Sequence, residues 1–475
     1  MIILLLFSQT AALVDCDAMP LDRTPQGVHI AYAGDPASTI RVSFFTCAGP
    51  ASNATSDGAF VTFLDASTNA TVSGSSQSYY SRWQHDIAVD ELDAGRLHRY
   101  AVQLGAAGPP SRVFSFRTAP AAAAAAGLHR SPFAAIILGD MGVNGSEATL
   151  ARVAKLTASG ASNVTIHVGD VGYADDHGMK LEPSSGRSYE AVYDLFQDSI
   201  EAIASSAPYM VCPGNHDVSC HVLSDAGCPK AQRNFSAFRA RFTMPSAASH
   251  AVDAGGRSVM GMWYSFTVAG VHMVSISTES DFAHAPTTPN TLVGGGKGGG
   301  FGDQLAWLED DLAAARADPA IDFIVVYGHR PWYASKASDW PLDAPRRVQT
   351  AFEPIFAAHR VDLYVCGHKH YYERIIAATA GVANAANGTV TIINGAAGNN
   401  ENLDTGKGVG GLVAAANYVA HGFGVLERLN ETALRWRYEL SESGEVVDEL
   451  VLRARHAPFT GGEPRGRHSL RGAEL

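Results

Sequence analysis

Five short apolar runs in this chain end in glycine, and a side chain that can bind a metal ion follows each glycine. The runs span 134–138, 166–168, 209–212, 323–327 and 363–366. Such runs are typical of buried strands, and in open α/β sheets the side chains at the carboxyl ends of strands meet in one crevice. The candidate ligands are Asp140, Asp170, Tyr173, Asn215, His329, His368 and His370. This set exceeds what one ion needs and fits two ions that share a carboxylate.

Each candidate taken alone is weak evidence for a metal site. An aspartate after a strand is more often a turn residue or a helix cap. His329 alone would fit a hydrogen-bonded buried histidine, and Tyr173 alone a half-buried aromatic. His167 alternates away from Asp170 along its strand, so we interpret it as structural. The prediction therefore depends on the joint occurrence of the five blocks.

The five blocks, in this order, resemble the metallophosphoesterase superfamily. They read D-x-G at Asp140, G-D-x-x-Y at Asp170 and Tyr173, G-N-H-D from Asn215 to Asp217, G-H at His329, and G-H-x-H at His368 and His370. Tyr173 narrows the resemblance to the purple acid phosphatases. It covers nearly the whole chain, and it implies Fe(III) with a second divalent metal, either Fe, Zn or Mn.

The resemblance also divides the ligands between the two ions. It assigns the ferric ion to Asp140, Asp170, Tyr173 and His370, and the divalent ion to Asp170, Asn215, His329 and His368. Asp170 is then the bridge. This division agrees with ligand chemistry, because phenolate and carboxylate favour a hard trivalent ion, whereas imidazole and amide suit a borderline divalent one.

His216 and Asp217 are the candidate catalytic residues. His216 follows a predicted ligand directly, and it resembles the family histidine that contacts phosphate and aids the leaving group. We expect the acidic neighbour Asp217 to orient it. Plant members carry two histidines at the positions of Ser338 and Asp339, so leaving-group contacts there must differ in this chain.

The implied reaction is hydrolysis of phosphate monoesters at acidic pH, by in-line attack of a metal-bound hydroxide. Small phosphorylated molecules are the expected substrates. A phosphodiesterase or nucleotide pyrophosphatase with the same metals is the alternative. A non-catalytic protein that kept the fold would have lost ligands, and none is lost. The net charge of −12 and the lack of a long basic run argue against nucleic acid as a partner. Oligomeric state stays open.

The chain of 475 residues is long enough for two or three domains. Short β-branched and aromatic runs in 22–119 predict an all-β sandwich, which resembles the fibronectin-like N-terminal domain of larger purple acid phosphatases. An alanine-rich linker at 120–130 follows. Strands alternate with helical patterns at 146–157, 189–203 and 303–314, which predicts an α/β metallophosphoesterase domain over 131–455. The resemblance implies two β-sheets sandwiched by helices. We expect a disordered tail at 456–475.

Several features predict passage through the secretory pathway, to the exterior or to a vacuole or lysosome. The apolar start reads as a signal peptide over 1–18, too short to span a bilayer. Seven N-x-S/T sites favour glycosylation: Asn53, Asn69, Asn144, Asn163, Asn234, Asn387 and Asn430. Cys220 and Cys228 could pair, and Cys16 with Cys47 is a weaker candidate that requires cleavage before Cys16. Cys212 and Cys366 read as small buried hydrophobes.

Overall fold

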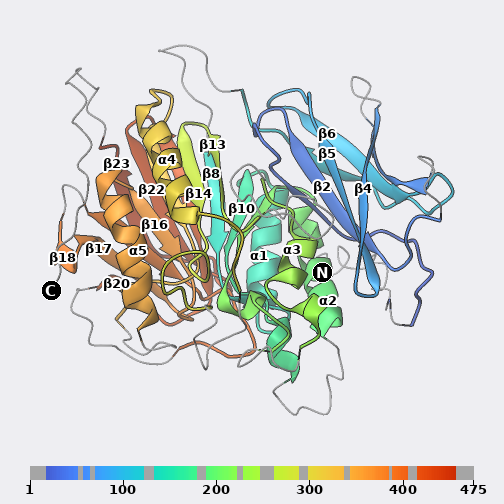
Figure 1. Cartoon of the computed structure of the whole chain (residues 1–475). Helices are drawn as coiled ribbons and strands as arrows, with labels where there is room; N and C mark the ends of the chain where they lie inside the picture. The colour runs from blue at the N-terminus through green and yellow to red at the C-terminus, as the bar shows by residue number, and fades with distance from the viewer. Residues whose placement is uncertain are drawn as a thin grey trace.

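The computed structural model describes residues 16, 18–51, 57–64, 70–121, 133–178, 189–221, 228–245, 261–287, 298–335, 343–384, 388–404 and 414–455. Most of the expected signal 1–18, most of the expected linker 120–130 and the whole tail 456–475 lie outside these residues, as do Ser338 and Asp339. Figure 1 shows an all-strand domain (blue) beside a larger domain of strands and helices.

The N-terminal domain is the expected β-sandwich. Its strands are β1 (Gln26–Ala31), β2 (Ile40–Thr46), β3 (Ala59–Phe63), β4 (Thr71–Tyr79), β5 (Arg82–Val89), β6 (Leu97–Leu104) and β7 (Phe114–Arg117). They pair in the order β1-β2-β5-β4-β3-β6-β7. Strand β4 pairs with β3 up to Gly74 and with β5 from Ser75 on, so it belongs to both layers. A Cβ at Gly74 would lie 2.2 Å from the carbonyl oxygen of Asp86, which explains the glycine at this crossing.

The larger domain contains two sheets. The first consists of β8 (Phe133–Leu138), β10 (Val164–Val168), β12 (Tyr209–Cys212), β21 (Gly422–Asn430), β22 (Ala433–Leu440) and β23 (Val446–Arg453). Its order is β12-β10-β8-β21-β22-β23, and β12, β10 and β8 are parallel. Every residue of β10 is buried, as expected for a strand covered on both faces.

The second sheet carries the other ligand-bearing strands. It consists of β13 (Tyr264–Val268), β14 (Val271–Ser275), β15 (Phe323–Tyr327), β16 (Leu363–Cys366), β17 (Tyr372–Thr379), β18 (Val382–Ala383), β19 (Thr389–Asn394) and β20 (Ala414–Tyr418). The order is β13-β14-β15-β16-β19-β17-β18, with β20 beside β17. Strands β14, β15, β16 and β19 run parallel. A small parallel pair, β9 (Met141–Gly142) and β11 (Val171–Gly172), joins the loops that follow β8 and β10.

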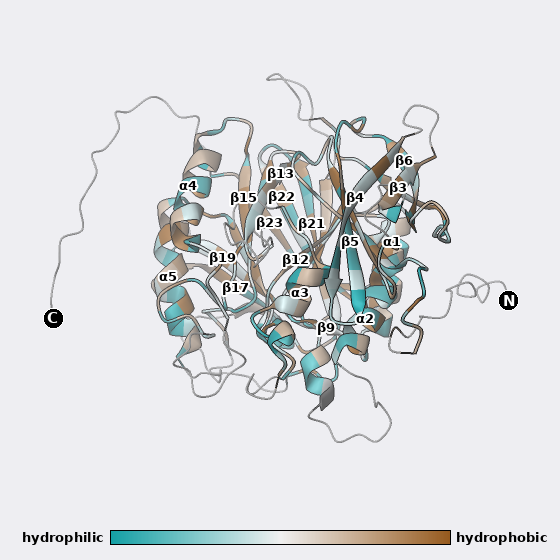
Figure 2. Cartoon of the chain, turned by 45° about the vertical axis from the view of Figure 1, so that its right-hand side comes forward, coloured by the Kyte–Doolittle hydropathy of each residue, from teal (hydrophilic) through white to brown (hydrophobic). Residues whose placement is uncertain are grey.

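Helices flank the two sheets as expected. They are α1 (Glu147–Ala158), α2 (Tyr189–Ala204), α3 (Ser236–Arg241), α4 (Gln304–Ala317) and α5 (Ala344–Ala358). Leu308 of α4 and Phe352 of α5 share a buried cluster with Val326 of β15, so these helices cover the second sheet. Figure 2 shows both hydrophobic and hydrophilic residues along α5, and its buried residues Val348, Phe352 and Phe356 are four apart, as in an amphipathic helix.

Helix α2 packs against strand β1 of the N-terminal domain. The Val28 N–H donates to Glu201 Oε2 over 3.0 Å, and the Tyr100 hydroxyl donates to the Ser205 carbonyl oxygen over 2.9 Å. One buried apolar cluster continues through both domains. The N-terminal domain is therefore firmly docked on the back of α2.

Both expected cysteine pairs form disulfides, Cys16–Cys47 and Cys220–Cys228. A signal peptide that ended at residue 18 would remove Cys16, so that boundary and the first disulfide exclude each other. Cys212 and Cys366 are free and buried, as predicted.

The exposure of the N-x-S/T asparagines decides which of them glycosylation could reach. Asn144 and Asn430 are exposed, whereas Asn163 and Asn234 are half-buried with their amides hydrogen-bonded to backbone. The remaining three sites lie outside the described residues. Among the helices that the structure describes, none is long and apolar enough to cross a bilayer.

Candidate metal centre

The predicted ligands follow the carboxyl ends of β8, β10, β12, β15 and β16, where two sheets meet. Four of them adopt positive φ angles: 58° at Asp140, 56° at Asp170, 51° at Tyr173 and 69° at His368. Non-glycine residues adopt this conformation rarely, and a cluster of them in one place is typical of a functional site. The strained backbone turns these side chains together into one buried site.

The glycines of the motifs leave room for the carboxylates. A Cβ at Gly214 would lie 2.2 Å from Asp170 Oδ1, and one at Gly367 would lie 2.2 Å from Asp140 Oδ2. The two carboxylates therefore rest directly against backbone that no other residue type could supply.

One half of the site gathers Asp140, Tyr173 and His370. The Tyr173 hydroxyl lies 2.8 Å from His370 Nε2 and 3.3 Å from Asp140 Oδ1. His370 Nε2 lies 3.4 Å from Asp140 Oδ1. The Tyr173 hydroxyl is also 3.4 Å from Asp170 Oδ2, so this half reaches the central carboxylate.

The other half gathers Asn215, His329 and His368. His329 Nε2 lies 3.1 Å from Asp170 Oδ2 and 3.1 Å from Asn215 Oδ1. Ligand atoms of Asp170, His329 and His368 all lie within 4.8 Å of one another. Asp170 Oδ2 thus faces ligands of both halves. The structure brings all seven predicted ligands together, and the donor set fits two cations that share Asp170.

Protons and hydrogen bonds balance the buried charge around Asp170. Burial by itself lowers the pKa of His329, but the carboxylate of Asp170 outweighs it, and the pKa rises to about 9. Burial also lowers the pKa of His370, but the hydrogen bond and charge of Asp140, with help from Glu401, raise it overall. Burial, Asp140 and Asp170 raise the pKa of the Tyr173 hydroxyl well above its usual value. A phenolate ligand there therefore requires a strongly charged cation beside it.

His216 faces the site from the 3₁₀ turn η3 (Asn215–Asp217). Its Nδ1 lies 3.0 Å from Asp175 Oδ1, and its Nε2 lies 4.0 Å from Asp170 Oδ2. Burial alone lowers the pKa of His216, yet Asp175 and Asp170 raise it well above its usual value. The Nε2 side of this imidazole thus faces the metal ligands.

Asp217 does not take the position expected of it, because the acid that orients His216 is Asp175. The Asp217 carboxylate accepts the N–H groups of Gly214 and Asp170 over 2.8 and 3.1 Å. It also accepts the Val171 N–H over 3.2 Å and the Tyr193 hydroxyl over 2.9 Å. Its side chain therefore ties together the two loops that carry Asp170 and Asn215.

The sequence reading missed other residues at the site. Asp175 lies two positions after Tyr173, and this closeness in sequence to a predicted ligand could have indicated that Asp175 belongs to the site. Glu401 Oε2 lies 3.9 Å from His216 Nε2 and 3.8 Å from His370 Nε2, although no motif marks it. Arg330 directly follows His329. It pairs with buried Glu279 over 2.7 Å and places Nη1 3.0 Å from His368 Nε2.

Three family models match this chain. The calcineurin-like phosphoesterase family model matches residues 134–372. The purple acid phosphatase N-terminal domain matches 25–118, and the iron/zinc purple acid phosphatase-like C-terminal domain matches 388–449. The three matches follow one another along the chain and coincide with the sandwich, the ligand-bearing strands and the final strands.

Relatives agree with these matches. The chain is 29% identical to an acid phosphatase of Aspergillus ficuum, over 78% of this chain and 76% of that protein. It is 28% identical to human acid phosphatase type 7, over 90% of both. The fold resembles purple acid phosphatase PPD1 from yellow lupin seeds, with a TM-score of 0.65, 18% identity, and coverage of 90% of this chain and 74% of that one. The chain therefore belongs to the purple acid phosphatases, within the calcineurin-like phosphoesterases, and is an enzyme of the acid phosphatase class.

Proposed function

We propose that this enzyme hydrolyses phosphate monoesters at a dinuclear centre of Fe(III) and a divalent ion, either Fe, Zn or Mn. The observation that carries the proposal is the position of Asp170 Oδ2, 3.1 Å from His329 Nε2 and 3.4 Å from the Tyr173 hydroxyl. One carboxylate oxygen thus faces the imidazole of His329 on one side and the phenol of Tyr173 on the other. That asymmetry matches one borderline divalent and one hard trivalent ion.

When bound, the two ions supply Lewis acidity that offsets phosphate charge and acidifies a water molecule. Asp140, Tyr173 and His370 would hold the ferric ion with Asp170. Asn215, His329 and His368 would hold the divalent ion with the same carboxylate.

The protein's own residues manage the proton that the leaving group needs. Asp175 holds Nδ1 of His216, so Nε2 points toward the ligands and presents a proton there. An alkoxide leaving group is a strong base, and a positioned acid accelerates its departure. Asp217 contributes indirectly, because it fixes the two loops on which Asp170 and His216 are carried.

Metal analysis combined with a substrate comparison tests this proposal. We expect two ions per chain, a visible absorption band from phenolate bound to Fe(III), and faster hydrolysis of a monoester than of a diester at acidic pH. A single ion in the active protein would contradict the dinuclear centre. Faster hydrolysis of the diester would instead favour the phosphodiesterase or nucleotide pyrophosphatase alternative.

We also propose that the protein passes through the secretory pathway. Two disulfides and the exposed sites Asn144 and Asn430 support this proposal. Endoglycosidase treatment of protein from its native source is expected to lower the apparent mass. An unchanged mass would contradict the glycosylated, secreted form.

A further inference from the structure

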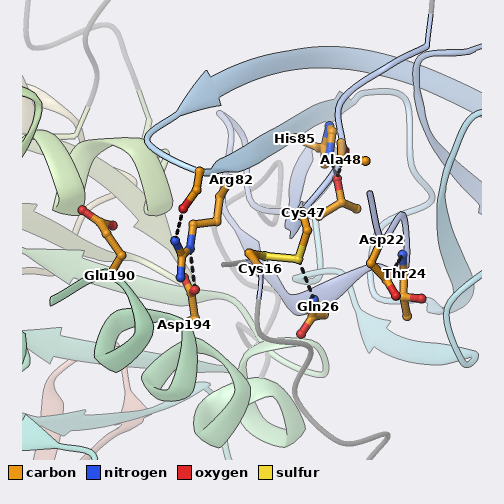
Figure 3. The surroundings of a disulfide bond; sticks show 12 residues. Cys16, Asp22, Thr24, Gln26, Cys47, Ala48, Arg82, His85, Glu190 and Asp194 are labelled. Atoms are coloured by element: carbon orange, nitrogen blue, oxygen red, sulfur yellow. Dashed lines mark hydrogen bonds and ion pairs between the residues drawn. A yellow bond between two sulfur atoms is a disulfide. The ribbon is translucent and has the colours of Figure 1, made fainter. Parts of the chain in front are cut away.

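A buried ionic network crosses the boundary between the two domains. Arg82 of β5 donates through Nε to Asp194 Oδ2 of α2 over 2.6 Å, and both side chains are at most 3% exposed (Figure 3). Arg241 of α3 donates through Nη2 to Asp194 Oδ1 over 2.9 Å and to Glu190 Oε2 over 2.8 Å. Tyr79 of the N-terminal domain donates to Glu190 Oε1 over 3.1 Å. Two cations and two anions are thus balanced in a site that excludes water.

The network continues to the metal-binding loops through one tyrosine. The guanidinium of Arg241 lies 5.0 Å from the ring centre of Tyr193, which is within cation–π range. The Tyr193 hydroxyl donates to Asp217 Oδ1 over 2.9 Å. The Asp217 carboxylate in turn accepts the N–H groups of Asp170 and Gly214. Each link is a direct contact between buried groups, and the last one joins the Asp217 carboxylate to the backbone N–H of the shared ligand Asp170.

Holding the two domains together would not by itself require the contacts that lead from Arg241 through Tyr193 to Asp217. Interdomain hydrogen bonds such as Tyr100 to Ser205 hold the domains together at the far end of α2 without reaching the site. The Arg82 network instead fixes the first turns of α2, from which Tyr193 extends to Asp217.

We propose that the N-terminal domain positions the metal-binding loops, with Arg82 and Tyr193 as positioning residues that act through Asp194, Arg241 and Asp217. The inference rests on the metal centre of the proposed function. Its consequence is slow metal loss, because Asp170 and Asn215 are carried on loops whose spacing Asp217 sets. The domain thereby affects catalysis without contributing a ligand.

The first test is Tyr193→Phe, with Tyr100→Phe as its matched control. Both variants remove one buried hydroxyl. Tyr193→Phe cuts the path, whereas Tyr100→Phe removes an interdomain hydrogen bond outside it. In the full-length metal-loaded enzyme, we measure metal release to a chelator by elemental analysis and by decay of the visible band. We expect release to be about 10-fold faster in Tyr193→Phe, since losing a group that supports metal ligands typically costs about 10–100-fold in metal affinity. Release from Tyr100→Phe should match the wild type.

The second test removes the interdomain pair without leaving an unpaired buried charge. The double substitution Arg82→Gln with Asp194→Asn deletes one charge of each sign. We expect metal release to rise about 2- to 30-fold, the range for mutations coupled to a site from a distance. Adding Tyr193→Phe to this variant should change release little further, because both substitutions interrupt one path.

These measurements distinguish failure of the positioning role from failure of the dinuclear metal centre. Unchanged metal release in Tyr193→Phe, or an equal increase in Tyr100→Phe, would overturn the inference while leaving the metal centre intact. Fewer than two ions in the wild type would overturn the proposed function first. If the charge-pair variant does not fold, Tyr193→Phe and its control still decide the question. We also expect the effect on activity to fall on kcat and not on KM, since Arg82 and Tyr193 are buried and closed to a substrate from solvent.

Discussion

Two buried histidines, one in each domain, respond oppositely to similar burial. His85 of β5 lies between two hydroxyls, with Thr46 Oγ1 2.8 Å from Nε2 and Ser76 Oγ 2.8 Å from Nδ1. Burial, with a smaller contribution from Arg23, lowers its pKa to about 3. His329 is equally enclosed, but Asp170 raises its pKa to about 9 against the effect of burial. Burial alone therefore does not decide the charge of a histidine; the neighbouring group does.

The difference explains why only one of these regions is suited to cations. Thr46 donates to the Ala48 carbonyl oxygen, so its hydroxyl accepts from His85 Nε2 while Ser76 donates to Nδ1. The sandwich histidine is thus satisfied as a neutral group. At the metal centre, carboxylates outnumber the hydroxyl donors, and they need positive charge from protons or metal ions. The following experiments test that contrast.

Asp170→Ala is expected to have the largest effect. The substitution removes the carboxylate that faces both halves of the site, so both ions and the activity should be lost together. Elemental analysis and hydrolysis of a monoester measure the two losses. His85→Gln is the control, because it alters a buried histidine of the other domain and should retain both ions. Retention of either ion by Asp170→Ala would show that the carboxylate is not the bridge.

His216→Ala should cost on the order of 10²–10⁴ in kcat for alkyl phosphates, the usual range for a general acid. The loss should shrink for nitrophenyl phosphate, because nitrophenolate leaves without a proton. Steady-state kinetics on both substrates measures the difference. Equal losses on the two would mean that His216 binds phosphate or orders the site without donating the proton.

Tyr173→Phe should remove the visible band and leave the fold in place. The hydroxyl of Tyr173 is the phenol that faces Asp140 and Asp170, and its raised pKa means that a cation must stabilise the phenolate. Tyr189→Phe is the matched control and should keep its colour. A band that survives in Tyr173→Phe would assign it to another ligand, or would show that the ion is not ferric.

The smallest expected effect is a pH dependence of stability carried by His85. Its pKa is about 3 in the folded protein and 6.5 when unfolded, so the unfolded chain binds more protons below pH 6.5. Stability contributed by neutral His85 is therefore present above pH 6.5 and is lost as the pH falls toward 3. From pH 7 to pH 5 the loss is about 2 kcal/mol.

Denaturant unfolding at both pH values, with and without His85→Gln, measures this contribution. The glutamine cannot be protonated in this range, so the variant should lose less stability on acidification than the wild type. His284→Gln, at an exposed position, is the control and should behave like the wild type. An identical pH dependence in wild type and His85→Gln would show that His85 is already protonated at pH 5.

Local sequence was sufficient to determine the strands and the ligands that follow them. The runs before Asp140, Asp170, Asn215, His329 and His368 are apolar and short, so each is stable only as a buried strand. Glycine must follow such a strand where a carboxylate rests against backbone, as at Gly214 and Gly367. An apolar strand, the glycine after it and the ligand that follows lie close together in the sequence, so they can be recognised from sequence alone. The fold class and the ligand set could therefore be predicted, although helices α3 and α5 and several strands of the larger domain, among them β17, β20 and β23, were not identified.

Only the tertiary structure decided which groups face one another across the chain. Asp217 adjoins His216 in sequence, yet its carboxylate turns toward Gly214, Asp170 and Tyr193, while Asp175 takes the imidazole. The pairing of Arg82 with Asp194 joins positions 112 residues apart. Such contacts depend on how helix α2 packs against the N-terminal domain. The spacing of residues along the chain does not predict this packing. The packing depends on surfaces that form only when the domains fold.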